Sequence, residues 1–323
     1  MNLIIAICTL TAGIIVLMGW KRSFKRKTCP FNGKTILITG GYSGIGLALA
    51  SRILENYDIK NLVIWGQNSS KLSDCQVLLE DLAARRKKKV FDETLPAAFI
   101  WTQMVDVGDS NSVLLAADEI LKKLGLIDIV VNNAGVVTGK SLVSGALHEE
   151  DCLRTMNVNA IAHVRLYQAF LPSMKKARTG RFVSILSTMS LGYASCLADY
   201  CASKWAALAY LHCLRFELKN SGYPEIRTLA VCPFLTNTKL FDGALENDGD
   251  TIVRKLFFPV LDAQDVAVKT IQAIEQEKQF LVIPWHMFYL YSLLGLLPVS
   301  VQDAITVWCG GHKGMKNFRG HGN

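Results

Sequence analysis

The chain has 323 residues, of which 50% are apolar, so it can bury a full core without disulfide bonds. Its nine cysteines include no Cys-x-x-Cys pair, which argues against a zinc site and a disulfide framework and favours reduced thiols. The net charge is +8, but no aromatic residues alternate with the basic runs, so nucleic-acid binding is not expected.

The first predicted element is an uncharged apolar segment, Leu3 to Trp20. A helix of this length covers about 27 Å, slightly less than the ~30 Å hydrocarbon core of a bilayer. A basic cluster follows between Lys21 and Lys27, whereas a cleaved signal peptide carries its positive charge before the apolar run. We therefore expect a membrane anchor over residues 1–20, either spanning a bilayer or lying in a monolayer, and a basic linker over residues 21–32. The basic cluster should keep the rest of the chain on the cytosolic side.

A glycine-rich turn follows the first predicted strand, Lys34 to Thr39. It reads Gly40-Gly-Tyr-Ser-Gly44-Ile-Gly46 and leads into an amphipathic helix, Leu47 to Asn56. Strand, glycine turn and helix in this order place backbone N–H groups and a helix N-terminus against a pyrophosphate. The alternative is a tight structural turn. The pattern indicates a dinucleotide site at the end of this strand.

The second predicted strand, Asn61 to Trp65, ends in Gly66-Gln67-Asn68. A carboxylate at this strand end binds the ribose 2′-hydroxyl and selects NAD. Here the acidic residue is missing and Lys71 follows closely, so a 2′-phosphate would not be repelled. The sequence favours NADP(H) over NAD(H).

The third and fourth predicted strands, Ala98 to Val105 and Ile127 to Val131, also end in polar or small residues. Asp106 could accept a hydrogen bond from an adenine amino group or cap the following helix. After the fourth strand, the small residues of Asn132-Asn-Ala-Gly135 let a cofactor lie against the backbone, and the asparagine amides hold the strand end. Next comes a long helix, Glu149 to Lys176, with two asparagines in Met156-Asn157-Val158-Asn159. Amides are costly to bury unpaired, so they either bond the backbone or hold a water for proton transfer.

The segment Ser187 to Lys204 carries the candidate chemistry. Tyr200 and Lys204 are four residues apart on one predicted helix, Asp199 to Asn220, and therefore share a face. Lowering a phenol pKa from about 10 to roughly 7 needs about 4 kcal/mol, and a neighbouring ammonium can supply much of this. Ser187 ends the fifth predicted strand, Arg181 to Leu186, where its hydroxyl could bind a carbonyl oxygen. The three groups predict acid/base catalysis between an alcohol and a carbonyl.

The remaining predicted elements continue the alternation. The sixth strand, Ile226 to Cys232, leads into Pro233 to Thr236, and residues 238–259 are expected to form a mobile cover over the substrate. The last predicted elements of the sheet domain are a helix over residues 263–277 and a seventh strand over residues 280–283. An apolar segment over residues 285–309 is expected to associate with a membrane or another subunit, and residues 310–323 to form a disordered basic tail.

Strands and helices alternate throughout residues 33–284, which predicts an α/β fold with one doubly wound, seven-stranded parallel sheet. The candidate sites fall at the carboxyl ends of the strands, where ligands bind in such sheets.

These motifs together resemble the short-chain dehydrogenase/reductase family from about residue 34 to residue 283, with a Rossmann-type domain. The resemblance implies that Tyr200 is the acid/base and that Lys204 lowers its pKa and holds the nicotinamide ribose. It implies that Ser187 orients the carbonyl and that Asn159, in a Met-x-Val-Asn pattern, anchors a proton-relay water. The expected cofactor contacts are Thr39, Gly40, Tyr42, Ser43, Gly44, Ile45, Gly46, Gln67, Asp106, Val107, Asn133, Ala134, Gly135, Tyr200, Lys204, Pro233 and Thr236.

The anchor and the apolar C-terminal segment look like the branch of retinol and 17-beta-hydroxysteroid dehydrogenases found on the endoplasmic reticulum and lipid droplets. Two departures from it are Gly66, where the branch carries an acidic residue, and Pro233-Phe234 in place of Pro-Gly. We expect a cytosol-facing, membrane-bound homodimer that moves a hydride between NADP(H) or NAD(H) and a lipophilic alcohol or ketone. A 3-ketosphinganine-type lipid ketone reductase and a non-catalytic membrane or lipid-droplet scaffold are the alternatives.

Overall fold

The computed structural model describes residues 30–90, 98–244, 259–312, 314, 315 and 318. The predicted anchor and nearly all of the basic linker lie outside these residues. Within them, no helix combines the length and the apolar character needed to cross a bilayer. The described residues from Phe31 onward belong to one compact unit, which holds every element described below.

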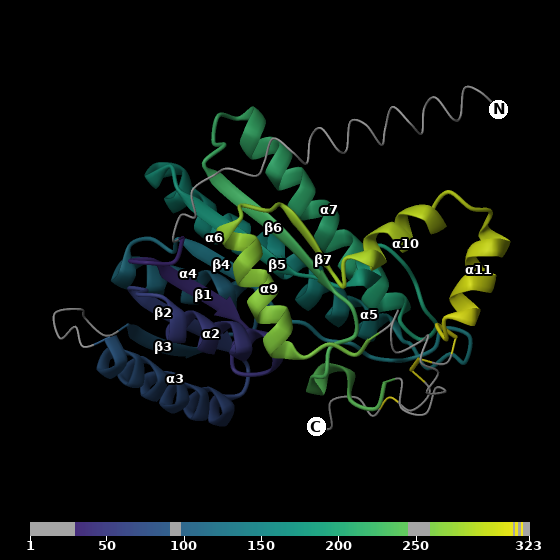
Figure 1. Ribbon diagram of the computed structural model, residues 1–323, viewed down its shortest axis with the longest axis horizontal. Coiled ribbons are helices and arrows are strands. Elements are labelled where there is room, and N and C mark those ends of the chain that lie inside the picture. The colour runs from purple at the N-terminus through teal and green to yellow at the C-terminus, as the bar shows by residue number, and fades with distance from the viewer. Residues whose placement is uncertain (1–29, 91–97, 245–258, 313, 316–317, 319–323) are drawn as a thin grey trace. The chain divides into compact units, whose positions relative to one another are not determined.

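A seven-stranded sheet forms the centre of this unit, as the sequence predicted (Figure 1). Its strands are β1 (Thr35–Thr39), β2 (Asn61–Gly66), β3 (Phe99–Met104), β4 (Ile129–Asn132), β5 (Gly180–Ile185), β6 (Ile226–Pro233) and β7 (Phe280–Ile283). All neighbouring strands run parallel in the order β3-β2-β1-β4-β5-β6-β7. The order reverses between β1 and β4, so the loops that follow these two strands diverge and leave a crevice at the carboxyl edge of the sheet.

Helices cover both faces of the sheet. One face packs against α2 (Gly44–Asn56), α3 (Ser69–Val90) and α9 (Ala263–Glu275), and the other against α4 (Ser110–Leu124), α6 (Ala162–Ala177) and α7 (Ala198–Asn220). Alternate residues of one strand therefore join different cores: Ile36 and Ile38 belong to the first, and Leu37 to the second. Burial on both faces explains why the strands read as continuous apolar runs.

The long helix predicted over Glu149 to Lys176 is divided in the structure. It consists of α5 (Glu149–Met156), a π-helical turn (Asn157–Ile161) and α6. The wider turn lies where the two asparagines occur. Arg165 donates to the Asn157 side chain at 2.9 Å and to its backbone carbonyl at 3.1 Å, which offsets the irregular backbone bonding there.

The apolar C-terminal segment folds as two helices, α10 (His286–Leu294) and α11 (Val299–Trp308), separated at Pro298. Gly310, with a φ of 84°, ends α11 in the left-handed region that glycine adopts readily. Of the predicted tail, only residues 310–312, 314, 315 and 318 are described, and these contact the rest of the unit. Ser195 donates its N–H to the Gly311 carbonyl at 3.0 Å, and the Met315 side chain is only 9% exposed.

Candidate active site

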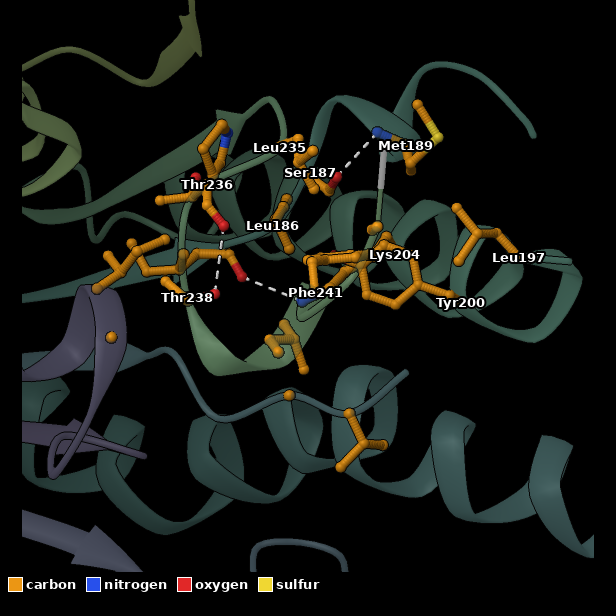
Figure 2. Close-up of a pocket in the computed structure, with 18 of the residues that line it drawn as sticks. Leu186, Ser187, Met189, Leu197, Tyr200, Lys204, Leu235, Thr236, Thr238 and Phe241 are labelled. Carbon is orange, nitrogen blue, oxygen red and sulfur yellow. Dashed lines mark hydrogen bonds between the residues drawn. The ribbon is translucent and has the colours of Figure 1, made fainter. Parts of the chain in front are cut away.

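A cavity of about 1210 Å³ opens at the carboxyl ends of the strands. Its wall is built by the loops that follow the strands β1 to β6, together with parts of α7, α10 and α11. Figure 2 shows Ser187, Tyr200 and Lys204 gathered on one side of this pocket, with Thr236 and Thr238 on the other. Residues from six strand ends therefore meet in one space.

The glycine turn after β1 forms one end of the cavity through Gly40, Tyr42, Ser43, Gly44 and Ile45. Gly40 and Gly44 have φ values of 62° and 53°, a conformation that residues with a side chain seldom adopt. Gly44 begins α2, so the unpaired N–H groups of that helix end face the cavity. This cradle fits the pyrophosphate of a dinucleotide.

Two of the predicted cofactor contacts, Thr39 and Gly46, lie behind the cavity wall and hold the glycine turn in place. Gly46 does not line the cavity, and a Cβ there would lie 2.5 Å from Asn133 Nδ2 and 2.6 Å from the Gly40 carbonyl oxygen. Thr39 also lies behind the wall, where its Oγ1 accepts from the N–H groups of Asn133 at 3.0 Å and Ala134 at 3.1 Å. In return the Asn133 amide donates to the Thr39 carbonyl at 3.0 Å. The ends of β1 and β4 are thereby fixed to each other, and Asn133, Ala134 and Gly135 line the cavity.

Polar groups collect at the other end of the glycine turn, after β2. Gln67, Asn68 and Lys71 all line the cavity there. The Tyr42 ring occupies the space that a Cβ on Gly66 would need. A side chain at position 66 could exist only if that ring moved.

Asp106 was predicted either to contact adenine or to cap a helix, and the structure excludes the second role. It is exposed, lies outside the cavity, and closes a turn by accepting from the Gly108 N–H at 2.7 Å. The N-cap of α4 is Asp109, which accepts from Asn111 and Ser112. Val107, the neighbouring predicted contact, does line the cavity.

Ser187, Tyr200 and Lys204 come together as their spacing suggested. Tyr200 and Lys204 project from the first turns of α7, and the Lys204 ammonium lies 5.6 Å from the centroid of the Tyr200 ring. Ser187 follows β5 and caps a short 3₁₀ helix by accepting from the Met189 N–H at 3.1 Å. Its hydroxyl also forms a hydrogen bond with the Tyr200 phenol.

The electrostatics of Tyr200 differ from the sequence-based prediction. Tyr200 is 2% exposed and Lys204 is 3% exposed. Burial raises the pKa of the Tyr200 phenol above its ordinary value of 10.0, and the hydrogen bond from Ser187 opposes this only in part. Burial also lowers the pKa of Lys204 to about 8, and its ammonium donates to the Ile185 carbonyl at 3.2 Å rather than to the phenol. In the protein alone the phenol pKa is therefore raised, opposite to the predicted fall, because the loss of water outweighs the hydrogen bond from Ser187.

Asn159 lies beside the site rather than in it. The residue is fully buried, and its amide donates to the Val136 carbonyl at 2.8 Å and to Ser203 Oγ at 3.0 Å. Its carbonyl oxygen accepts from the Val136 N–H at 2.8 Å. Both amide hydrogens are therefore used within the protein. Of the two interpretations left open by the sequence, these contacts favour the structural one.

The loop after β6 forms the wall opposite Ser187. Pro233 and Thr236 line the cavity, and Thr236 Oγ1 donates to the Phe234 carbonyl at 3.0 Å. The predicted mobile cover is described only in part: Lys239–Phe241 form a 3₁₀ turn, and residues 245–258 lie outside the described residues. Phe241 meets the Tyr200 ring edge to face, with 5.5 Å between centroids.

Several wall residues carry no sequence motif and were not predicted as site residues. Tyr291 of α10 occupies the space that a Cβ on Gly192 would need, and its buried hydroxyl hydrogen-bonds Thr188. Burial raises the pKa of this phenol. Ile305 and Met315 reach the cavity from α11 and the tail. Their contacts join segments that are far apart in the sequence, so no local pattern could have indicated them.

Comparisons with known proteins agree with this arrangement. The sequence profile described as short chain dehydrogenase matches residues 34–249. A cattle protein called short-chain dehydrogenase/reductase family 16C member 6 is 33% identical over 80% of this chain and 75% of its own length. Mouse epidermal retinol dehydrogenase 2 is 30% identical over 89% of this chain and 86% of its own length.

Solved structures show the same fold. A short chain dehydrogenase/reductase from Burkholderia phymatum in complex with NAD has a TM-score of 0.69 and 24% identity, over 83% of this chain and 95% of that one. A short-chain dehydrogenase from Sphingobium yanoikuyae in complex with NADPH has a TM-score of 0.62 and 22% identity, over 85% and 95%.

Proposed function

Because the chain belongs to the short chain dehydrogenase family of NAD(P)-dependent oxidoreductases acting on CH–OH groups, we propose a function of this kind. The protein interconverts a lipophilic alcohol and its carbonyl compound at a membrane surface. The observation that carries the proposal is the meeting of Ser187, Tyr200 and Lys204 with the glycine turn in one cavity. A retinoid or a hydroxysteroid is the proposed class of substrate. The similarity to retinol dehydrogenases supports this choice.

The residues that line the cavity have different roles in the proposed reaction. Gly40 to Ile45 and the loops after β2 and β4 would hold the dinucleotide, whose chemistry when bound is to supply or accept a hydride. Tyr200 moves the proton at the substrate oxygen. Because burial keeps this phenol protonated, it is ready to donate a proton to the oxygen of a carbonyl that is being reduced. Ser187, which hydrogen-bonds the same phenol, orients that oxygen.

Lys204 acts through its charge. Its pKa of about 8 leaves the ammonium mostly protonated at neutral pH, in spite of burial. A cation 5.6 Å from the phenol ring centroid lowers the cost of the phenolate that remains after proton transfer. Asn159 contributes by fixing Val136, a residue of the cavity wall, through its three hydrogen bonds.

The substrate side of the cavity supports an apolar ligand. Beyond Tyr200 the wall consists mainly of apolar side chains, including Leu197, Leu240, Phe241, Leu290 and Ile305. An apolar wall with a few convergent polar groups is the usual environment for a lipophilic substrate. The hydroxyl or carbonyl oxygen would be the only part of such a ligand that the wall needs to bond.

Helices α10 and α11 support docking on a lipid surface. They line the cavity with one side, and large apolar side chains are exposed at their ends and between them: Trp285 at 72%, Leu296 at 82% and Trp308 at 77%. Exposed apolar side chains on adjacent helices indicate an interaction site, and tryptophan favours the interface of a membrane. The apolar run over residues 3–20 would hold the chain at the endoplasmic reticulum or a lipid droplet, with the catalytic domain facing the cytosol. A homodimer is part of the same proposal.

NADP(H) is the proposed cofactor. Tyr42 leaves no space for an acidic side chain at position 66, and Lys71 supplies a positive charge at the same end of the cavity. A 2′-phosphate is therefore attracted rather than repelled.

A substrate panel tests the proposal. Full-length protein in phospholipid vesicles is incubated with NADPH or NADH and with retinal, a ketosteroid or 3-ketosphinganine, and the absorbance of the reduced cofactor is followed. We expect retinal or the ketosteroid to be reduced, faster with NADPH. Reduction of 3-ketosphinganine alone would move the assignment to the long-chain lipid ketones. Lack of turnover and of cofactor binding would support the scaffold alternative.

A further inference from the structure

We infer that the segment after α11 is part of the substrate pocket and that Met315 sets the width of the pocket beside Tyr200. This inference rests on the proposed function, since it assigns a specificity-determining residue to the same site. The segment involved comprises Gly310 to His312, Gly314, Met315 and Phe318, and we call it the C-terminal strap.

The strap is directed back toward the site by the way α11 ends. Gly310 adopts a φ of 84°, and the Gly311 N–H bonds the Thr306 carbonyl at 2.9 Å. A Cβ on Gly311 would lie 2.7 Å from Thr306 Cγ2, so glycine allows the chain to fold closely against the helix. The strap therefore leaves α11 in a defined direction.

Two loops of the active site hold the strap. On one side, the Ser195 N–H donates to the Gly311 carbonyl at 3.0 Å. Ser195 lies in the loop between Ser187 and Tyr200. On the other side, the Phe318 ring occupies the space that a Cβ on Gly139 would need, in the loop after β4. Gly139 has a φ of 68°, which suits glycine in any case. The strap thus joins the loops that follow β4 and β5, the two strands next to the reacting groups.

Met315 is the strap residue that reaches the substrate space. It is 9% exposed, lines the cavity, and packs in one apolar cluster with Val137, Leu197 and Tyr200. Met315 thus faces the cavity from the same apolar cluster as Tyr200. It therefore limits how wide a substrate can be at the reacting carbon. Methionine is unbranched and adaptable, so its replacement should change the size of the pocket more than the fold around it.

Substitutions that fill or empty this space provide the test. Met315→Trp should narrow the pocket, and Met315→Ala should widen it. Full-length variants in vesicles are assayed with NADPH on a ketosteroid, which is broad, and on decanal, which is slim. We expect Met315→Trp to lower the ratio of kcat/KM for the ketosteroid to that for decanal by about tenfold and Met315→Ala to raise it, because changes of a few methylene groups in an apolar pocket have effects of this order.

Matched controls and a binding readout complete the design. Met104→Trp and Met104→Ala place the same changes on a side chain that is 68% exposed and outside the cavity, and they should leave the ratio unaltered. The fluorescence of bound retinol measures occupancy of the pocket without turnover, and Met315→Trp should weaken this binding at least about fivefold.

The two readouts separate this inference from the proposed function. If the wild-type protein binds retinol but reduces neither carbonyl compound, the proposed function is wrong. Weaker retinol binding by Met315→Trp would then still show that Met315 forms part of the pocket wall. If both Met315 variants match the Met104 controls in the substrate ratio and in retinol binding, Met315 does not bound the pocket and the inference is wrong.

Discussion

The Tyr42 ring packs against Gly66 so closely that a Cβ at position 66 would collide with it. Tyr42 belongs to the glycine turn after β1, and Gly66 ends β2, the strand that usually carries the residue that discriminates between cofactors. The Tyr42 ring therefore excludes an acidic side chain from position 66 at the end of β2. Cofactor preference must come from groups farther along the loop.

Lys71 is the group that we expect to select NADPH. Lys71→Ala should raise the KM for NADPH about tenfold and leave the KM for NADH within about twofold, because only NADPH carries the 2′-phosphate that the ammonium would bond. Steady-state kinetics with both cofactors checks this. Lys60→Ala removes an exposed lysine that does not line the cavity and serves as the control. Equal changes for the two cofactors would show that Lys71 does not read the phosphate.

Lipid contact by α10 and α11 can be measured by fluorescence quenching. In full-length protein with Trp20 replaced by phenylalanine, brominated acyl chains should quench part of the tryptophan emission. Replacing Trp285 and Trp308 as well should remove most of the quenchable fraction, since both are largely exposed, one at the start of α10 and the other at the end of α11. Trp205, 52% exposed on α7, is the matched control, and Trp205→Phe should preserve the quenching. Quenching that survives without Trp285 and Trp308 would contradict the proposed docking surface.

Buried His163 should make the protein sensitive to acid. Burial, assisted by the charge of Lys204, lowers the pKa of His163 from 6.5 to about 3, and its Nδ1 lies 3.1 Å from Ser184 Oγ. Between these pH values the unfolded chain binds a proton that the folded chain does not. Stability from this group is therefore complete above pH 6.5 and is lost as the pH falls, by about 1.4 kcal/mol per pH unit.

Urea unfolding of wild type and His163→Gln between pH 4.5 and 7.5 measures this contribution. The variant should show a shallower loss of unfolding free energy with falling pH, whatever its absolute stability. His312→Gln, at an exposed position, should retain the wild-type slope. Parallel slopes for wild type and His163→Gln would mean that His163 takes up a proton in the folded protein over this pH range.

The fold was largely predictable because its signals are local. Apolar runs such as Lys34 to Thr39 and the glycine turn that follows mark a parallel sheet with a ligand crevice, and the sheet has the predicted number of strands. The division of the long helix at Asn157 was missed, because the π-helical turn is held by contacts with residues elsewhere in the fold, such as those of Arg165 with Val107 and of Asn159 with Val136.

The site was predictable where chemistry dictates residue type and spacing, as for Tyr200 and Lys204. It was not predictable where packing decides. Gly46 and Thr39 fit a cofactor motif, yet they hold the turn from behind. Met315 came from a tail whose composition suggested disorder, and only the tertiary structure places it beside Tyr200. The direction of the Tyr200 pKa shift also depended on burial, which the sequence pattern could not supply.

The most direct test of the central claim is the turnover of Tyr200→Phe, measured with saturating NADPH and the best substrate of the panel. The substitution removes one hydroxyl and keeps the ring that packs against Phe241. We predict that kcat falls by about a hundredfold or more, while NADPH binding, followed by nicotinamide fluorescence, is unchanged. A variant that turns over within a few-fold of wild type would show that Tyr200 is not the proton donor.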